Sequence, residues 1–177
     1  MEKKRKSSAN LLAKECIVTA LLQLIYEKPL SSITISELAA RAGVSRMTIY
    51  RNYDSKEDIF STELAEVMEQ YREEDARDIQ GGTYYDRNHM THCFAFLYRK
   101  REFFEGLLHC GFGQMFLSQL TDFLLDKWGS QYPGRKEQYK LEAFAGALYG
   151  LFISWSASRY GEPVGDMVEI LNEMYGE

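Results

Sequence analysis

The 177-residue sequence predicts an all-α fold of about nine helices, with an N-terminal three-helix domain and a C-terminal antiparallel helical bundle. Apolar residues recur every three to four positions along most of the chain, which is the period of a helix with one buried face. No segment alternates apolar and polar residues as a half-buried strand does. Three prolines leave long stretches free to be helical, and 45% hydrophobic residues can build a core.

The first helix should begin near Ser7 or Ser8, because either hydroxyl can cap a helix N-terminus. Pro29 ends it, since the residue before a proline disfavours helical dihedral angles. Its buried face is predicted to contain Ala13, Ile17, Ala20, Leu21 and Leu24.

Residues 30–60 predict two short helices followed by the start of a long one. Thr34 or Ser36 can cap the first short helix, and Gly43 after it supplies a turn residue that tolerates a left-handed backbone. Ser45 can cap the second, which has about six residues. Two short helices joined by a tight turn and packed on the first helix form a helix-turn-helix, whose second helix fits the major groove of DNA.

The rest of the chain predicts longer helices separated by glycine- and proline-containing breaks. The expected segments are Lys56 into the seventies, Tyr84–His109 as two pieces meeting near residues 100–102, Gln114–Trp128, Lys136–Tyr160 and Val164–Tyr175. We therefore expect two domains, a DNA-binding domain with a basic tail at residues 1–56 and a helical effector-binding and dimerisation domain at residues 57–177.

The charges are unevenly divided between these parts. Residues 1–56 contain 10 Lys and Arg and 5 Asp and Glu, a net charge of +5, whereas residues 57–177 contain 11 and 21, a net charge of −10. A basic end on an acidic body suggests that a polyanion docks at the N-terminal end only.

The second short helix carries side chains suited to reading DNA. Arg46 can form a bidentate bond with guanine, and Met47 or the Thr48 methyl can touch a thymine methyl. Tyr50, Arg51 and Asn52 follow at the end of the helix. The helix N-termini near Ser36 and Lys56 can each hold a phosphate.

The run TISELAARAGVSRMTIYRNYDSKEDI resembles the DNA-binding domain of the TetR family of bacterial transcription regulators, over about residues 8–60. The AGVS turn, the two tyrosines after it and the SKE at the next helix start fall in the family's order. The rest of the chain is similar to the family only in length and helical content.

This resemblance implies roles for matching positions. Phosphate contacts are implied for Thr34, Ser36, Tyr50, Tyr53 and Lys56. Base contacts are implied for Ser45, Arg46, Met47 and Thr48, with Asn52 at the margin. Many members have Gly where Met47 stands, so a longer side chain here fills more of the groove.

Structural roles for some of these residues stay open at this point. Tyr50 and Tyr53 can instead pack against the first helix, and Lys56 can be a solvated residue at a helix start. The basic run Lys3–Lys6 is either a solvated tail or an arm that reaches DNA.

The aromatic-rich body offers two further predictions. Helical bundles build ligand sites between helices, and an effector pocket is expected around Phe104, His109, Cys110, Gln114, Tyr149 and Phe152, although ordinary core packing explains most of these aromatics. The helix at residues 136–160 has a large apolar stripe and a second stripe of small residues, so both faces must be covered. We expect a two-fold homodimer, with Gly146, Gly150, Ser154, Met167 and Leu171 in its interface; the alternative is a monomeric core helix.

The sequence indicates a cytoplasmic regulator that binds double-stranded operator DNA as a homodimer and responds to an effector. Three widely spaced cysteines fit a reducing compartment, and no segment reaches the length of uncharged apolar residues that spans a bilayer, so no membrane partner is expected. We expect no cofactor, no catalytic residues and no metal site, because His89, His92 and Cys93 lack the second half of a ligand set.

Two alternatives remain. The body can bind a co-regulator protein instead of a small molecule, which would make the chain an effector-relay subunit. An enzyme with an accessory helix-turn-helix is disfavoured, because no nucleophile–base–acid constellation and no phosphate-binding glycine loop is found.

Overall fold

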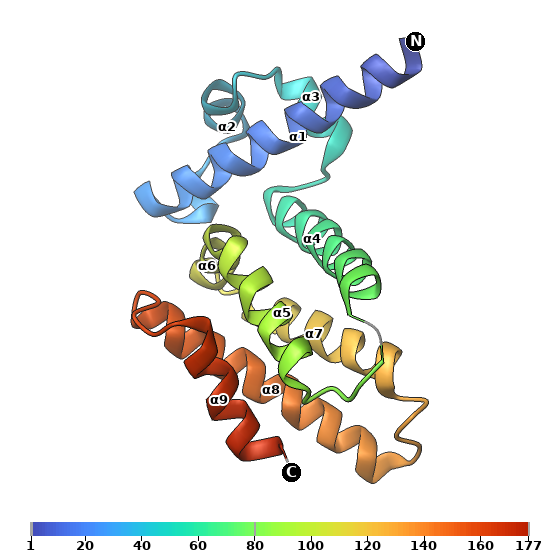
Figure 1. The fold of residues 1–177 in the computed structure, drawn as a ribbon. Coiled ribbons are helices and arrows are strands. Elements are labelled where there is room, and N and C mark those ends of the chain that lie inside the picture. Colours follow the sequence, from blue (N-terminus) through green and yellow to red (C-terminus); the bar gives the residue numbers. More distant parts are fainter. Residues whose placement is uncertain (1, 80, 177) are drawn as a thin grey trace. The chain divides into compact units, whose positions relative to one another are not determined.

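A computed structural model describes residues 2–79 and 81–176, with side chains from residue 9 onward, so Lys3–Lys6 lie outside the described side chains. Within these residues the chain forms nine α-helices and one 3-10 turn and contains no strand, which confirms the all-α prediction (Figure 1). The elements are α1 (Glu2–Glu27), η1 (Leu30–Ser32), α2 (Ile35–Ala42), α3 (Arg46–Asn52), α4 (Lys56–Asp78), α5 (Arg87–Arg99), α6 (Arg101–His109), α7 (Gly113–Trp128), α8 (Arg135–Ala157) and α9 (Val164–Tyr175).

The chain forms two compact units. The first contains Met1–Ala65 together with Gly106–Gly111, and the second contains Glu66–Glu105 and Phe112–Glu177. Helices α4 and α6 therefore each contribute residues to both units. The expected functional boundary after residue 56 stays a prediction, but the first compact unit extends nine residues beyond it into α4.

In the first unit, α1 packs on α2 and α3 through the apolar stripe that its sequence predicts. Ile17, Ala20, Leu21 and Leu24 are buried there, and Leu38 and Ile49 face them from the two short helices. The helices α1, α2 and α3 thus enclose a small apolar core.

Local side-chain caps define the ends of the short helices. Thr34 accepts a hydrogen bond from the backbone N–H of Glu37, whose carboxylate bonds back to Thr34, forming a capping box. Gly43 ends α2 with φ of +66°, a left-handed conformation that glycine adopts without steric strain. Ser45 caps α3 by accepting from Thr48 N–H at 3.1 Å.

The C-terminal turn of α6 belongs to the first unit. Gly106 lies so close to α1 that a Cβ there would come within 2.3 Å of the Leu22 side chain. His109 Nε2 lies 3.1 Å from the carbonyl oxygen of Ile25, and its ring lies 4.8 Å from that of Tyr26. The C-terminal turn of α6 therefore packs against the C-terminal part of α1.

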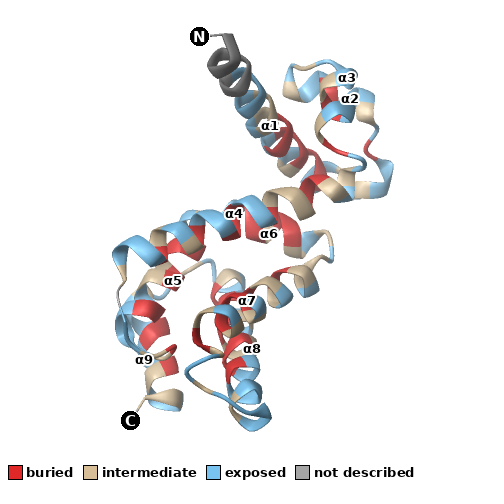
Figure 2. Cartoon of the chain, turned by 90° about the vertical axis from the view of Figure 1, so that its right-hand side faces the viewer, coloured by how far each residue is buried: buried red, intermediate tan, exposed pale blue. Residues whose placement is uncertain are grey.

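The second unit is a bundle in which α7 packs on α8 and α5 packs on α9. Its buried residues are mostly aromatic residues and leucines. The buried positions are coloured red on the cartoon in Figure 2. Phe104, Phe116 and Phe152 form one cluster with ring centroids 4.4–5.8 Å apart. The core is thus built from edge-to-face and tilted aromatic contacts.

Several helix ends differ from the sequence prediction. Helix α1 begins at Glu2, before the expected serine cap, because Lys and Arg favour helices and no proline or glycine interrupts them. Helix α8 ends at Ala157, because Arg159 and Tyr160 take φ values near +57°. Tyr160 there packs 5.0 Å from the Trp155 ring and donates to Glu105 at 2.5 Å.

Among the described residues, one segment, Ala9–Glu27 of α1, is long and apolar enough for a membrane span. The sequence prediction concerned uncharged apolar stretches, and this segment is not one of them. It includes Lys14 and Glu15, and its apolar face packs on α2 and α3. A core helix meets the same criterion.

Candidate nucleic-acid interface

Helix α3 presents one apolar side chain to the core and most of the others to solvent. Ile49 is buried, whereas Met47 is 67% and Tyr50 57% exposed. Arg46 and Arg51 are exposed as well. A short helix that exposes two arginines, a tyrosine and a methionine can contact both base edges and phosphates.

Polar contacts within α3 hold its exposed side chains in place. The Ser45 and Thr48 hydroxyls lie 2.9 Å apart, and Asn52 donates to the carbonyl oxygen of Thr48 at 2.7 Å. Ser45 and Asn52 therefore support the helix ends besides being candidates for DNA contacts.

Two ion pairs, which the sequence analysis missed, tie α2 to the end of α1. Arg41 forms a bidentate pair with Glu27, at 2.8 and 3.0 Å, and Lys28 pairs with Glu37. Hydrogen bonds from Lys28 and Thr34 lower the pKa of Glu37 to about 2. Opposite charges 9 and 14 residues apart carry no local pattern, so only the folded arrangement reveals these pairs.

Two predicted phosphate contacts need correction. Tyr53 is 3% exposed, so its ring is part of the core, which is the alternative considered for it above. Lys56 Nζ donates to the carbonyl oxygens of Leu30 and Ile33, at 2.5 and 2.6 Å. The ammonium group closes the η1 turn onto α4, which is a structural role. Thr34, the N-cap of α2, and Ser36, in its first turn, are both exposed.

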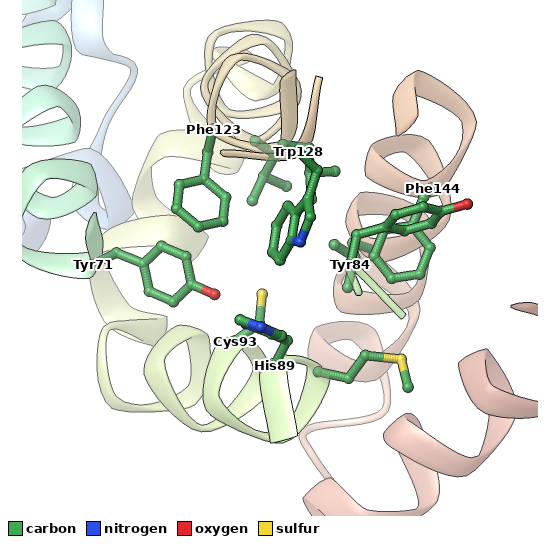
Figure 3. Close-up of a pocket in the computed structure, with 11 residues that line it drawn as sticks. Tyr71, Tyr84, His89, Cys93, Phe123, Trp128 and Phe144 are labelled. Carbon is green, nitrogen blue, oxygen red and sulfur yellow. The ribbon is translucent and has the colours of Figure 1, made fainter. Parts of the chain in front are cut away.

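The second unit contains an internal cavity of about 20 Å³, which is room for a water molecule rather than an organic ligand (Figure 3). Five aromatic side chains, His89 and Cys93 contribute to its wall (Figure 3). Burial raises the pKa of the Cys93 thiol to about 12, so it remains protonated and is a poor nucleophile. Its lining residues are Tyr71, Tyr84, His89, Met90, Cys93, Leu120, Phe123, Leu124, Trp128, Phe144 and Leu148.

None of the six predicted pocket residues lines this cavity. His109 and Cys110 belong to the first unit, and Gln114 is exposed. Phe104 and Phe152 are fully buried in the aromatic cluster, and the Tyr149 ring lies 5.7 Å from that of Phe116. His109 and Cys110 therefore belong to a different unit from the other four residues, so neither unit contains all six.

Of the residues predicted for the dimer interface, some are exposed and others are buried within the subunit. Gly150 and Ser154 are exposed on α8, and a Cβ at Gly146 or Gly150 would meet no atom within 4 Å. Met167 and Leu171, by contrast, are 4% and 1% exposed within their own subunit. They cannot form an interface, because the apolar stripe of α9 faces its own bundle.

A buried polar network beside the cavity was also missed. Asp75 contacts both His89 and Lys127. Burial raises the pKa of Asp75 while hydrogen bonds from His89 and Lys127 lower it, and the net result is a lowered pKa. The sequence predicts no metal site at His89 and gives no indication of its partners Asp75 and Lys127. Groups of three or more His, Cys, Asp or Glu suited to a metal are absent from the described residues.

Comparison with known proteins finds a family model that is similar to the N-terminal part of the chain. Residues 17–62, which include α2, α3 and the turn between them, match the family model of bacterial regulatory proteins, tetR family. The match covers the exposed side chains of α3 and the caps described above.

Solved structures extend the similarity of fold to nearly the whole chain. Lin0861 from Listeria innocua is 17% identical with a TM-score of 0.76, covering 93% of this chain and 89% of that one. The transcriptional regulator FadR from Bacillus subtilis, solved with stearoyl-CoA, is 19% identical (TM-score 0.63; 92% and 98% covered). NalD of Pseudomonas aeruginosa, the secondary repressor of the MexAB-OprM multidrug efflux pump, is 21% identical (TM-score 0.61; 93% and 96% covered).

Proposed function

We propose that this chain, whose residues 17–62 match the tetR family model, is a TetR-type transcription regulator that binds a palindromic operator as a homodimer under the control of an effector. The observation that carries the proposal is the exposure of Arg46, Met47, Tyr50 and Arg51 on α3, with Ile49 anchoring the helix from beneath. We further propose that the protein is cytoplasmic and has no catalytic activity.

DNA recognition would use α3 as the helix in the major groove. Arg46 at its first turn would read a guanine, and Met47 would contact an apolar base edge such as a thymine methyl. Thr34, Ser36, Tyr50 and Arg51 would contact phosphates around it. The net charge of +5 on residues 1–56 supports this orientation, since the body carries −10.

A dimer would present two copies of α3 to successive major grooves, about 34–36 Å apart. The exposed small residues of α8, Gly150 and Ser154, support close approach of a second subunit. On α9 the exposed apolar residues are Ile170 and Met174, so these replace Met167 and Leu171 in the proposed interface.

Effector control is proposed for the apolar cavity of the second unit. FadR, which has a similar fold, was solved with stearoyl-CoA, which supports a site for an apolar ligand in the body. The cavity is small, so binding would require the bundle to open. If the body binds a co-regulator protein instead, small molecules will not shift its melting temperature or its DNA affinity.

Selection of genomic DNA fragments by the purified full-length protein tests the proposal. We expect an enriched palindrome, and fluorescence anisotropy should show binding that weakens steeply with salt, because phosphate contacts release counterions. Absence of any enriched sequence at low salt would contradict the proposal. A metabolite screen by thermal shift, repeated on the DNA complex, tests effector control separately.

A further inference from the structure

Three polar side chains meet beside the cavity, one from each of three helices; two of them are buried, and the third, Lys127, is partly exposed. Asp75 of α4 and His89 of α5 are 2% and 3% exposed, and Lys127 of α7 forms an ion pair with Asp75. Charged groups are costly to bury unless they are paired and hydrogen-bonded. The protonation state of each group must therefore give it the charge and the hydrogen-bond donors that its partners require.

Both ring nitrogens of His89 face oxygen acceptors. Nδ1 lies 3.2 Å from Oδ1 of Asp75, and Nε2 lies 2.9 Å from the carbonyl oxygen of Gly81. A neutral imidazole has one N–H and one lone pair, so either neutral tautomer would direct a lone pair at one of these oxygens. Only the doubly protonated ring donates to both.

The two carboxylate oxygens of Asp75 contact two different side chains, His89 and Lys127. Lys127 Nζ lies 3.5 Å from Nδ1 of His89 and opposes a positive ring, but it pairs with Oδ2 of Asp75 while His89 uses Oδ1. Lys127 also lies 4.7 Å from the centroid of the Trp128 ring, which stabilises its charge.

The other titratable groups near the Asp75–His89–Lys127 network are neutral or are bonded to other residues. Burial raises the pKa values of Tyr71 on α4 and Cys93 on α5, so both stay neutral. Tyr84, between α4 and α5, also has a raised pKa because of burial. Asp86 bonds to Thr83, at 2.9 Å to its backbone N–H. Helix α8 adds only apolar groups, Phe144 and Leu148, to the cavity wall.

The partner of His89 belongs to a segment of defined shape, residues 81–86, called here the linker. Gly81 and Gly82 have φ of +72° and +85°, conformations that favour glycine. The Gly82 carbonyl accepts from Trp128 Nε1 at 3.2 Å. Tyr84, farther along the linker, lines the cavity and packs 5.0 Å from the Phe144 ring. The linker is therefore one wall of the cavity, held at its start by His89 and Trp128.

We propose that His89 is a proton-dependent latch: with both ring nitrogens protonated it holds the linker against the bundle, and loss of one proton releases the linker and opens the cavity wall at Tyr84. The latch closes at low pH and opens as the pH rises, because Asp75 Oδ1, which lies closer to Nδ1 than Lys127 Nζ does, retains the proton on Nδ1, and the bond to Gly81 is lost with the proton on Nε2. This inference does not depend on DNA binding, and both tests below use the free protein.

The first test is ¹⁵N-detected NMR of the imidazole nitrogens of the full-length protein. The chain has only three histidines, His89, His92 and His109, so the signals can be assigned by single substitutions. We expect two protonated nitrogens on His89 at low pH and loss of one proton as the pH rises while the protein remains folded. A single neutral tautomer of His89 throughout the folded range would overturn the proposal.

The second test is hydrogen exchange of the Trp128 indole N–H, which donates to the Gly82 carbonyl of the linker, as a function of pH and corrected for intrinsic exchange rates. Wild-type protection should fall with rising pH by no more than about tenfold per pH unit, the limit for release of one proton. H89Q should show low protection at every pH. H92Q is the matched control, since His92 lies on the same helix but stacks on Tyr71, and it should behave as wild type. Wild-type protection that ignores the His89 titration would refute the latch, even if H89Q does not fold.

Discussion

In the proposed DNA complex, single side chains would decide which bases α3 reads, and Arg46 is the one best suited to a guanine. It lies at the first position of α3 and is exposed. Arg46→Ala should weaken binding to the selected operator by about 1–3 kcal/mol, roughly 5- to 150-fold, and relax base choice at one position per half-site. Anisotropy titrations over a set of operator variants measure both effects.

Arg135→Ala is a suitable control for that experiment, because Arg135 is exposed on α8 in the other compact unit. It removes the same charge without touching α3. Equal losses for the two variants, or an unchanged base preference in Arg46→Ala, would argue against base recognition by Arg46.

The sequence predicts a phosphate contact for Lys56, whereas its ammonium group binds backbone carbonyl oxygens within the domain. Lys56→Ala would leave the carbonyl oxygens of Leu30 and Ile33 without their ammonium donor. Since Lys56 is only half-buried, we expect a loss of about 1–2 kcal/mol in the free energy of unfolding. Urea unfolding measures this loss, with exposed Lys136→Ala as the control. Unchanged stability together with weaker DNA binding would restore the phosphate role.

Among the short elements, the turn between α2 and α3 depends on one residue. A Cβ at Gly43 would meet no atom within 4 Å, so a substitution there acts only through the left-handed backbone. Gly43→Ala should lower the free energy of unfolding by about 1–2 kcal/mol, whereas Gly43→Asn should lower it less, because asparagine tolerates this conformation. Chemical unfolding of the two variants compares them. Equal effects would mean that backbone strain is not the cause.

The N-terminus of α2 should respond to acid through Glu37. Its pKa is lowered in the folded state, so its contribution to stability is present above the usual pKa of 4.5 and is lost as the pH falls toward 2. Unfolding free energies of wild type and Glu37→Gln should therefore differ near neutral pH and converge below pH 4.5. A difference that persists to the lowest pH would show that lost packing, rather than charge, destabilises the variant.

At the scale of the whole molecule, the proposed dimer would depend on the exposed side of α8. A leucine at Gly150 meets open space in the subunit, so Gly150→Leu should leave the subunit fold intact and weaken the proposed dimer. Gln138→Leu is the control, since this exposed residue is turned by 120° from Gly150 around the helix. Sedimentation velocity over a concentration series should show dissociation of Gly150→Leu only. Identical profiles for both variants and wild type would place the dimer contact elsewhere.

The sequence alone determined the features that depend on neighbours within about four residues. Helical periodicity predicted most helices, including the break between α5 and α6 at Lys100. The caps at Thr34 and Ser45 and the turn at Gly43 followed from residue type, and so did the exposed side of α3, because one buried Ile49 sets the orientation of a seven-residue helix.

Tertiary structure decided where side chains of the same type end up. Tyr50 and Tyr53 are both aromatic and three residues apart, yet only Tyr53 is buried. Lys56 reaches carbonyl oxygens 23 and 26 residues away, and His89 contacts Asp75 across a helix pair. Burial and pairing of this kind depend on which surfaces meet in three dimensions, and no pattern along the chain encodes the partner of a buried charge.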